Sequence, residues 1–239
     1  MAQSGSAFVV VPILVVGGAV VVQLFRSWLR HRREEFIRNY RWPAGLLARL
    51  EKQHAGFQRK DSALVSRGLR QFFLAYARSG KRFVSMPSQV ADDLWHEFIL
   101  YTREYQAFCR KAFGGFLHHT PAVVLSENRK NNEGLRRVWW HCCKEENIDP
   151  VHPSRLPLLF ALDAKYKIAG GFTYHPQCQQ LRQGGSGAAH CGGDFASSSV
   201  DGSTDGFGDS SSDGSGGDSS GGDGGDGGGG GGGGCGGGD

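Results

Sequence analysis

Residues 85–115 read SMPSQVADDLWHEFILYTREYQAFCRKAFGG and hold the most regular helical pattern of the chain. The apolar positions that recur at steps of three and four are Val90, Leu94, Phe98, Tyr101, Tyr105, Phe108 and Ala112. Such spacing places these side chains on one side of an α-helix. Ser85 and Ser88 offer capping hydroxyls around Pro87, and Gly114-Gly115 ends the pattern. We therefore predict one core helix that begins after Ser88 and ends before Gly114.

Four further helices are predicted on both sides of this stretch. The segments with helical spacing are the one after Pro43 with Leu46, Leu47 and Leu50, then 62–78, 131–146, and the segment after Pro153, where Ser154 could cap a helix with Leu158, Leu159, Leu162 and Tyr166. No long segment alternates with a period of two, and only residues 171–175 suggest a short extended piece. The fold class that we predict is all-α, with about five helices in a domain at residues 26–183.

An uncharged apolar segment, AFVVVPILVVGGAVVVQLF, occupies residues 7–25 after a short N-terminal segment at residues 1–6. A helix of this length rises about 28 Å, close to the roughly 30 Å of a bilayer's hydrocarbon core. The alternatives are a buried strand, for which the segment is too long, and a cleaved signal peptide, for which residues 1–6 lack basic side chains. The segment predicts a single transmembrane helix, with the lipid bilayer as a partner.

Arginines cluster directly after the apolar segment, at Arg26, Arg30, Arg32 and Arg33, whereas residues 1–25 contain no lysine or arginine. Positive charge is enriched on the cytoplasmic side of membrane proteins, so we expect a single-pass membrane protein whose C-terminal domain is cytoplasmic. The same lipid-facing basic cluster could attract anionic headgroups. The simpler interpretation is that it only sets the orientation.

The carboxyl-terminal residues 184–239 are dominated by glycine, serine and aspartate. Nine of the chain's 23 acidic residues follow Arg182, and none of its 27 basic residues does. Few apolar side chains are available there to offset the entropy of ordering, so we predict a disordered, acidic tail. The six cysteines show no even framework, which favours reduced thiols over disulfides.

Asp92 and His96 lie four residues apart on the predicted core helix and are therefore neighbours on its surface. The simpler interpretation is that His96 is buried and that Asp92 holds it through a structural hydrogen bond. With His118 and His119, which lie in a predicted turn, they could instead form a His/Asp site for a divalent metal that activates water. Adjacent side chains more often point apart, and loop histidines are often solvated.

His175, Cys178, His190 and Cys191 form a second set of metal-ligating residue types, although their spacing matches no zinc finger. His141, Cys142 and Cys143 are consecutive on a predicted helix, which favours a partly buried and partly exposed arrangement. Phosphate-binding and catalytic motifs are missing, so no catalytic residue is predicted. Nucleic acid is an unlikely partner because the basic residues lack a stacking platform or a recognised module.

Trp95-His96, Leu100, Tyr105 and Cys109 resemble the Trp-His-x-His-x-Leu…Tyr…Cys element of the glycine-rich domain-containing proteins. The similarity covers about 30 residues, and a glycine-rich carboxyl end is a further shared feature. The family is largely uncharacterised, so the resemblance implies a helical domain rather than a reaction. Phe98 stands where the pattern has its second histidine, which would remove one ligand if both histidines bound a metal.

Taken together, the sequence favours a membrane-anchored helical interaction module with an unknown protein partner, rather than an enzyme. No cofactor is predicted on this interpretation. The alternative is a metal-binding or metal-dependent hydrolytic domain that uses Asp92, His96, His118 and His119. The distance between the rings of His96 and His119 separates the two hypotheses, because ligands of one ion must converge.

Overall fold

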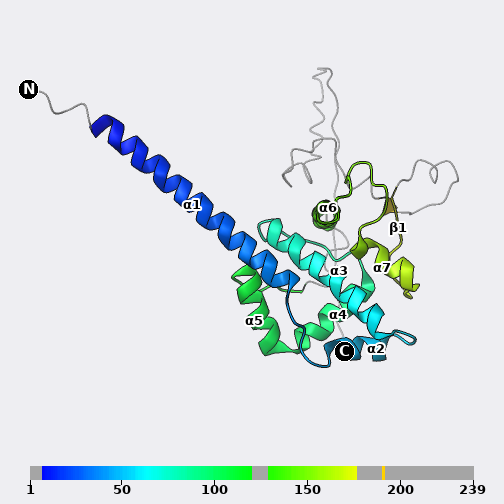
Figure 1. Cartoon of the computed structure of the whole chain (residues 1–239). Helices are drawn as coiled ribbons and strands as arrows, with labels where there is room; N and C mark the ends of the chain where they lie inside the picture. The colour runs from blue at the N-terminus through cyan, green and yellow to red at the C-terminus, as the bar shows by residue number, and fades with distance from the viewer. Residues whose placement is uncertain (1–6, 120–128, 177–189, 192–239) are drawn as a thin grey trace, which may run out of the picture. The chain divides into compact units, whose positions relative to one another are not determined.

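Seven α-helices and two short strands make up the part of the chain that the computed structural model describes, residues 7–119, 129–176 and 190–191 (Figure 1). The helices are α1 (Ala7–Arg38), α2 (Leu46–Gln53), α3 (Arg59–Arg78), α4 (Gln89–Leu100), α5 (Thr102–Phe113), α6 (Arg129–Glu145) and α7 (Leu158–Tyr166). Strands β1 (Tyr174–His175) and β2 (His190–Cys191) pair in parallel, with Tyr174 opposite His190. The prediction of an all-α class is confirmed.

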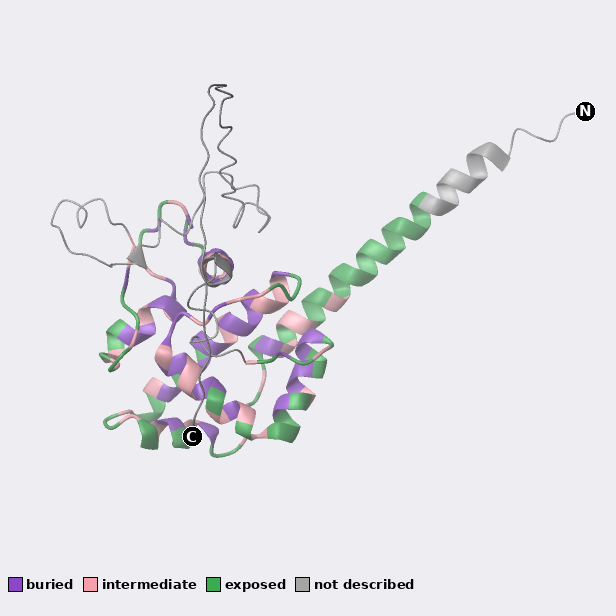
Figure 2. Ribbon diagram, turned by 180° about the vertical axis from the view of Figure 1, so that it is seen from behind, coloured by how far each residue is buried: buried purple, intermediate pink, exposed green. Residues whose placement is uncertain are grey.

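Helix α3 lies at the centre of the core and contacts α1, α2, α4, α6 and α7. Its buried side chains include Leu69, Phe72 and Phe73, and Figure 2 shows the buried residues of the helices facing one another. Gly68 permits the close approach of α7, because a Cβ atom at this position would lie 2.6 Å from a methyl carbon of Leu162. Burial of the aromatic and aliphatic faces against α3 supplies the main stabilising contribution to the fold.

The predicted core helix between Ser88 and Gly114 is in fact two helices, α4 and α5. Tyr101 separates them with φ −81° and ψ 63°, values outside the helical region. In one straight helix, Phe98 and Phe108 would be about 15 Å apart along the axis. The break brings their ring centroids to 5.4 Å and buries both side chains. Packing between the two aromatic faces therefore explains the correction.

The other predicted helices are present with small shifts at their ends. Ser154 does not cap α7, which begins at Leu158 with Pro157 at its N-cap. The residue before a proline is disfavoured in helical conformation, so the helix begins only after Pro157. Cys109, Cys142 and Cys143 are free and buried. Of the consecutive residues His141, Cys142 and Cys143, both cysteines are buried, and His141 is partly buried.

The predicted transmembrane segment at residues 7–25 forms the first part of α1, and the side chains of residues 7–15 are outside the described ones. Within the described part of the chain, no helix has both the length and the apolar character needed to cross a membrane. The predicted tail also lies outside the described residues, apart from the two residues of β2.

The last turns of α1 are fixed to the helical body by packing and by an ion-pair network. Ile37 is completely buried. Arg78 on α3 pairs with Glu34 on α1 at 2.8 Å and with Glu145 on α6 at 2.7 Å, and Arg38 pairs with Glu145 at 2.8 Å. These charges are partly shielded from water, which makes the network stronger than isolated surface pairs.

Candidate metal centre

Helix α4 carries two of the predicted ligands on the same face. Ser88 caps the helix, as its position in the sequence predicts, and its Oγ accepts a hydrogen bond of 3.3 Å from the backbone N–H of Ala91. Asp92 follows in the first turn, where the helix dipole favours a carboxylate. His96 lies one turn later, with its Nδ1 3.6 Å from Oδ2 of Asp92.

A buried carboxylate from α7, that of Asp163, holds the start of α4 in place. Its oxygens accept hydrogen bonds from Ser88 Oγ at 2.7 Å and from the backbone N–H groups of Gln89 at 2.7 Å and Val90 at 3.2 Å. The backbone N–H of Phe172 donates a fourth, at 2.9 Å. Asp163 thus satisfies donors that a helix N-terminus leaves without intrahelical partners. Sequence reasoning missed this residue because it lies 75 positions from Ser88.

His119, a third predicted ligand, comes from the segment after α5 and is positioned by a chain of hydrogen bonds. Trp95 Nε1–H donates to Tyr105 Oη at 3.1 Å, and the Tyr105 hydroxyl donates to the carbonyl of Leu117 at 2.6 Å. The ring of Trp95 also meets the ring of His119 edge-on, with centroids 4.6 Å apart. Tyr105 therefore fixes the backbone just before His119, and Trp95 fixes the position of its ring.

The side chains of Asp92, His96 and His119 converge. His119 Nε2 is 2.9 Å from Oδ1 of Asp92, and the ring centroids of His96 and His119 are 4.2 Å apart. One ligand atom from each residue lies within 4.8 Å of the other two. Around a tetrahedral zinc ion, ligand atoms are about 3.3 Å apart, so shifts on the order of 1 Å would complete the geometry. Two of the three side chains are largely shielded, which favours a built site over a solvated one.

The convergence answers the question that the sequence left open. His96 is 53% exposed, so the interpretation of a buried histidine held by Asp92 is wrong. The imidazole within hydrogen-bond distance of Asp92 is instead that of His119. His118 does not join the cluster; its ring packs edge-on against Phe116, with centroids 4.8 Å apart. Of the four predicted ligands, the structure brings three together.

Phe98, which replaces the second histidine of the family pattern, does not subtract a ligand from this site. Residues 96 and 98 are separated by about 200° around a helix, and Phe98 is completely buried in the core. A side chain at position 98 therefore cannot reach the ion that His96 would bind. A second imidazole, that of His119, lies beside His96 and comes from a different segment.

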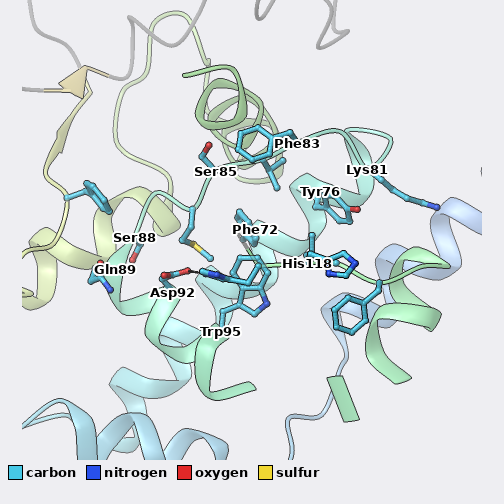
Figure 3. Close-up of a pocket in the computed structure, with 16 residues that line it drawn as sticks. Phe72, Tyr76, Lys81, Phe83, Ser85, Ser88, Gln89, Asp92, Trp95 and His118 are labelled. Atoms are coloured by element: carbon cyan, nitrogen blue, oxygen red, sulfur yellow. Dashed lines mark hydrogen bonds and ion pairs between the residues drawn. The ribbon is translucent and has the colours of Figure 1, made fainter. Parts of the chain in front are cut away.

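A cavity of about 300 Å³ adjoins two of the three converging side chains, those of Asp92 and His119. Asp92, Trp95 and His119 contribute to its wall, and the rest of the lining is mainly aromatic and aliphatic (Figure 3). Lys81 lies at its edge, with the amine directed away from Asp92 and towards α1. A metal held by two imidazoles and one carboxylate keeps coordination positions free for water or a substrate. The cavity offers space for such a molecule beside those positions.

The second predicted set of ligands gains no support as a site. His175 lies opposite Cys191 in the register of the two strands. Cys178 lies outside the described residues, as do the side chains of His190 and Cys191. Within the described part, Asp92, His96 and His119 are the one group whose ligand atoms converge as a metal requires.

Comparison with known proteins places this domain in a family. A family model described as UCP032817-like matches residues 32–195, more than half of the chain. The chain belongs to the UCP032817-like family. The UCP032817-like region begins within α1 and includes Asp92, His96, His119 and Asp163, whereas residues 7–25 lie outside it. The description names no reaction, ligand or partner, and the resemblance to glycine-rich domain-containing proteins stays a prediction.

No curated protein and no solved structure shows significant similarity to the chain.

Proposed function

We propose that the helical domain binds a divalent transition-metal ion through Asp92, His96 and His119. The observation that carries this proposal is the approach of three ligand atoms to within 4.8 Å of one another. They come from one helix and from a segment 27 residues away. Oxygen and imidazole nitrogen ligands suit zinc, iron and related ions. The cavity lined by Asp92 and His119 lies next to this group of ligand atoms.

The reaction class that we propose for this centre is metal-dependent hydrolysis. Two histidines and one carboxylate form the ligand set of zinc sites that lower the pKa of a bound water molecule to about 7. The aromatic lining next to Asp92 and His119 favours a substrate with an apolar body.

Metal titration of the full chain in neutral detergent tests the proposal. After treatment with a chelator, we expect one equivalent of Zn²⁺ or Co²⁺ to bind, measured by calorimetry and by the optical bands of Co²⁺. His96→Ala and His119→Ala should each weaken binding by at least about tenfold, since loss of a supporting residue alone costs 10–100-fold. His118→Ala is the matched control and should bind normally.

Two results would overturn the metal proposal. One is occupancy below about a tenth of an equivalent at saturating metal, with no change in His96→Ala. The other is an equal loss of affinity in His118→Ala, which would mean that the loop histidines bind metal without the geometry described above.

A second proposal concerns attachment of the domain to a lipid bilayer, with the body on the cytoplasmic side. It is supported by the uncharged sequence of residues 7–25 and by the surface of α1. The large apolar side chains that are 51–65% exposed on this helix are Val16, Val20, Val21, Leu24, Phe25 and Trp28. A continuous apolar surface of this kind is costly in water and stable in lipid. Binding of a protein partner by the anchored domain belongs to the same proposal.

Charge substitutions in the full chain test the attachment. Val16→Lys/Val20→Lys adds two charges to the exposed apolar surface, at a cost of roughly 2.5–3.5 kcal/mol each in the middle of a bilayer. We expect this variant to leave the membrane pellet after alkaline extraction. Gln53→Lys/Gln106→Lys adds the same charge at exposed positions of the body and should stay in the pellet. Retention of both variants would contradict the proposal.

A further inference from the structure

A cavity of about 250 Å³ lies between α1 and the end of α3, and basic side chains line it. Arg26, Arg30 and Arg33 follow one another at steps of four and three residues, so they share one face of α1. Lys81 reaches the same cavity from the loop after α3. Figure 3 shows the Lys81 side chain directed towards α1. Four cations therefore meet at one cavity.

The backbone at the end of α3 is arranged to bring Lys81 to this position. Gly80 has φ 68° and Lys81 has φ 64°, so two successive residues adopt the left-handed region. Such a conformation is unfavourable for a lysine and persists where surrounding structure imposes it. The Lys81 backbone N–H donates to the carbonyl of Tyr76 at 3.1 Å, which closes the turn.

The four cations have no acidic partners among the residues that the structure describes, and no ion pair is formed by Arg26, Arg30, Arg33 or Lys81. Elsewhere in the body, Arg38, Arg78 and other arginines are paired with carboxylates. Like charges at one cavity repel one another, so an anion that binds there relieves the repulsion as well as forming new attractions.

The remaining walls of the cavity are apolar and lead to the lipid-facing part of α1. Leu29, Ala112 and Phe113 form part of the lining. Val22 and Phe25 lie four residues before Arg26 and Leu29 and therefore one turn along the same side of α1. Their side chains are 47% and 58% exposed. The cavity thus lies beside an exposed apolar surface of α1.

From this arrangement we propose that the cavity binds the phosphate of an acidic phospholipid headgroup, while the acyl chains lie along Val22 and Phe25. Basic pockets beside membrane helices bind anionic headgroups in this way. The phosphate chemistry alone would also suit a free phosphate ion; the apolar surface beside it favours the lipid. The inference rests on the proposed membrane attachment.

Arg32 provides a control within the same cluster. Its guanidinium lies over the ring of Trp28, 5.1 Å from the centroid, and does not line the cavity. The sequence assigned Arg26, Arg30, Arg32 and Arg33 to one lipid-facing group. The structure divides that group, with Arg32 outside the cavity and Lys81 added to it.

Short-chain lipids added to the full chain in neutral detergent micelles test the inference. We expect dioctanoyl phosphatidylglycerol to bind at least about tenfold more tightly than dioctanoyl phosphatidylcholine or inorganic phosphate. Arg30→Gln/Lys81→Gln should weaken binding of phosphatidylglycerol by about 25-fold, at roughly fivefold for each basic residue removed. Arg32→Gln/Arg41→Gln removes the same charge and should change the affinity less than twofold. All four substituted side chains are exposed, so the fold should tolerate both variants.

Three outcomes would overturn the inference. Equal weakening in Arg32→Gln/Arg41→Gln would reduce the effect to net charge. Equal affinity for phosphatidylcholine would remove the role of the anionic headgroup, and equal affinity for inorganic phosphate would leave an ion site without lipid. A chain that stays in the membrane pellet but shows any of these results would retain the proposed attachment while losing the headgroup site.

Discussion

At the scale of single residues, Tyr105 joins the two segments that carry the proposed ligands. Its hydroxyl accepts from Trp95 on α4 and donates to Leu117. Burial raises the pKa of Tyr105 far above its ordinary value, so the hydroxyl keeps the proton that it donates to Leu117. The residue is almost fully buried, which leaves no water to replace either bond.

Tyr105→Phe should therefore destabilise the fold and disturb the metal centre. The variant keeps the ring but leaves the Trp95 N–H and the Leu117 carbonyl without partners, which costs about 2–4 kcal/mol for two buried groups. Urea unfolding measures this loss, and metal titration should show weaker binding because His119 follows Leu117 closely. Tyr101→Phe removes an exposed hydroxyl bonded to Ala44 and should cost below about 1 kcal/mol. Equal stability of the two variants would refute the positioning role.

His141 provides a second prediction at this scale. Burial, together with the positive charge of Arg78, lowers the pKa of His141 to about 4. Its Nε2 atom is buried and has no hydrogen-bond partner among the described residues. In the unfolded chain, a histidine titrates near 6.5. Between about pH 6.5 and 4, the unfolded state binds a proton here that the folded state does not, so stability falls as the pH falls.

We expect His141 to lower the free energy of unfolding by up to about 3 kcal/mol between pH 6.5 and pH 4. His141→Gln should flatten the dependence of unfolding free energy on pH within this window, as measured by urea denaturation at several pH values. His152→Gln changes a histidine that is 81% exposed and should keep the slope of the natural chain. Parallel slopes for both variants would show that His141 is not responsible.

Part of the candidate site could be predicted from the sequence at this scale. Asp92 and His96 follow from helical spacing alone, since residues four apart are neighbours. His118 and His119 could not be told apart, because the choice depends on how Leu117 is held by Tyr105. Asp163 gave no local signal, because its partners at Ser88, Gln89 and Val90 become neighbours only when α7 packs beside α4.

At the scale of elements, the helical segments were predictable and the break at Tyr101 was not. The segment around Tyr101 contains neither glycine nor proline, and its apolar positions fit one continuous helix. The break is decided by contacts between Phe98 and the α5 residues Tyr105 and Phe108. Tertiary packing thus overrides a local pattern.

The attachment of α7 to the start of α4 gives a prediction for these two elements. Asp163→Asn keeps the shape of the side chain but places an NH₂ group among four donors, which removes charge-assisted hydrogen bonds. We expect a loss of about 2–4 kcal/mol in unfolding free energy, together with weaker metal binding, because Asp92 and His96 depend on the position of α4.

Asp149→Asn is the matched control for Asp163→Asn. Asp149 is 56% exposed and bonds to the backbone of Val151, so its amide variant should lose less than about 1 kcal/mol. Gly171 gives an independent check on the same contact, since a Cβ atom there would lie 2.8 Å from the Cβ of Asp163. Gly171→Ala should therefore be destabilising, while Gly115→Ala, with open space around it, should be tolerated. Equal stability of all four variants would exclude a role for Asp163 in holding α4.

At the scale of the whole molecule, α1 links two regions of opposite character. Its first part carries exposed apolar side chains, and its last turns are joined to the body through Glu34, Arg38 and the buried Ile37. One continuous helix therefore connects the proposed lipid-embedded segment to the family domain that begins at residue 32. The proposed metal centre would consequently work close to a membrane surface.

The distribution of charge along the chain makes the orientation testable. Residues 1–25 contain no lysine or arginine, and the arginines begin at Arg26. Because basic residues close to a membrane helix stay on the cytoplasmic side, a tag at the C-terminus should be protected from protease added outside sealed cells. A variant that adds three lysines before the apolar segment and removes two arginines after it weakens this charge difference. In this variant, Gln3→Lys/Ser4→Lys/Ser6→Lys/Arg26→Gln/Arg30→Gln, a measurable fraction of the tag should become accessible to the protease. Digestion of the tag in the natural chain would place the body outside the cell and refute the cytoplasmic orientation. This result would not bear on the proposed metal site.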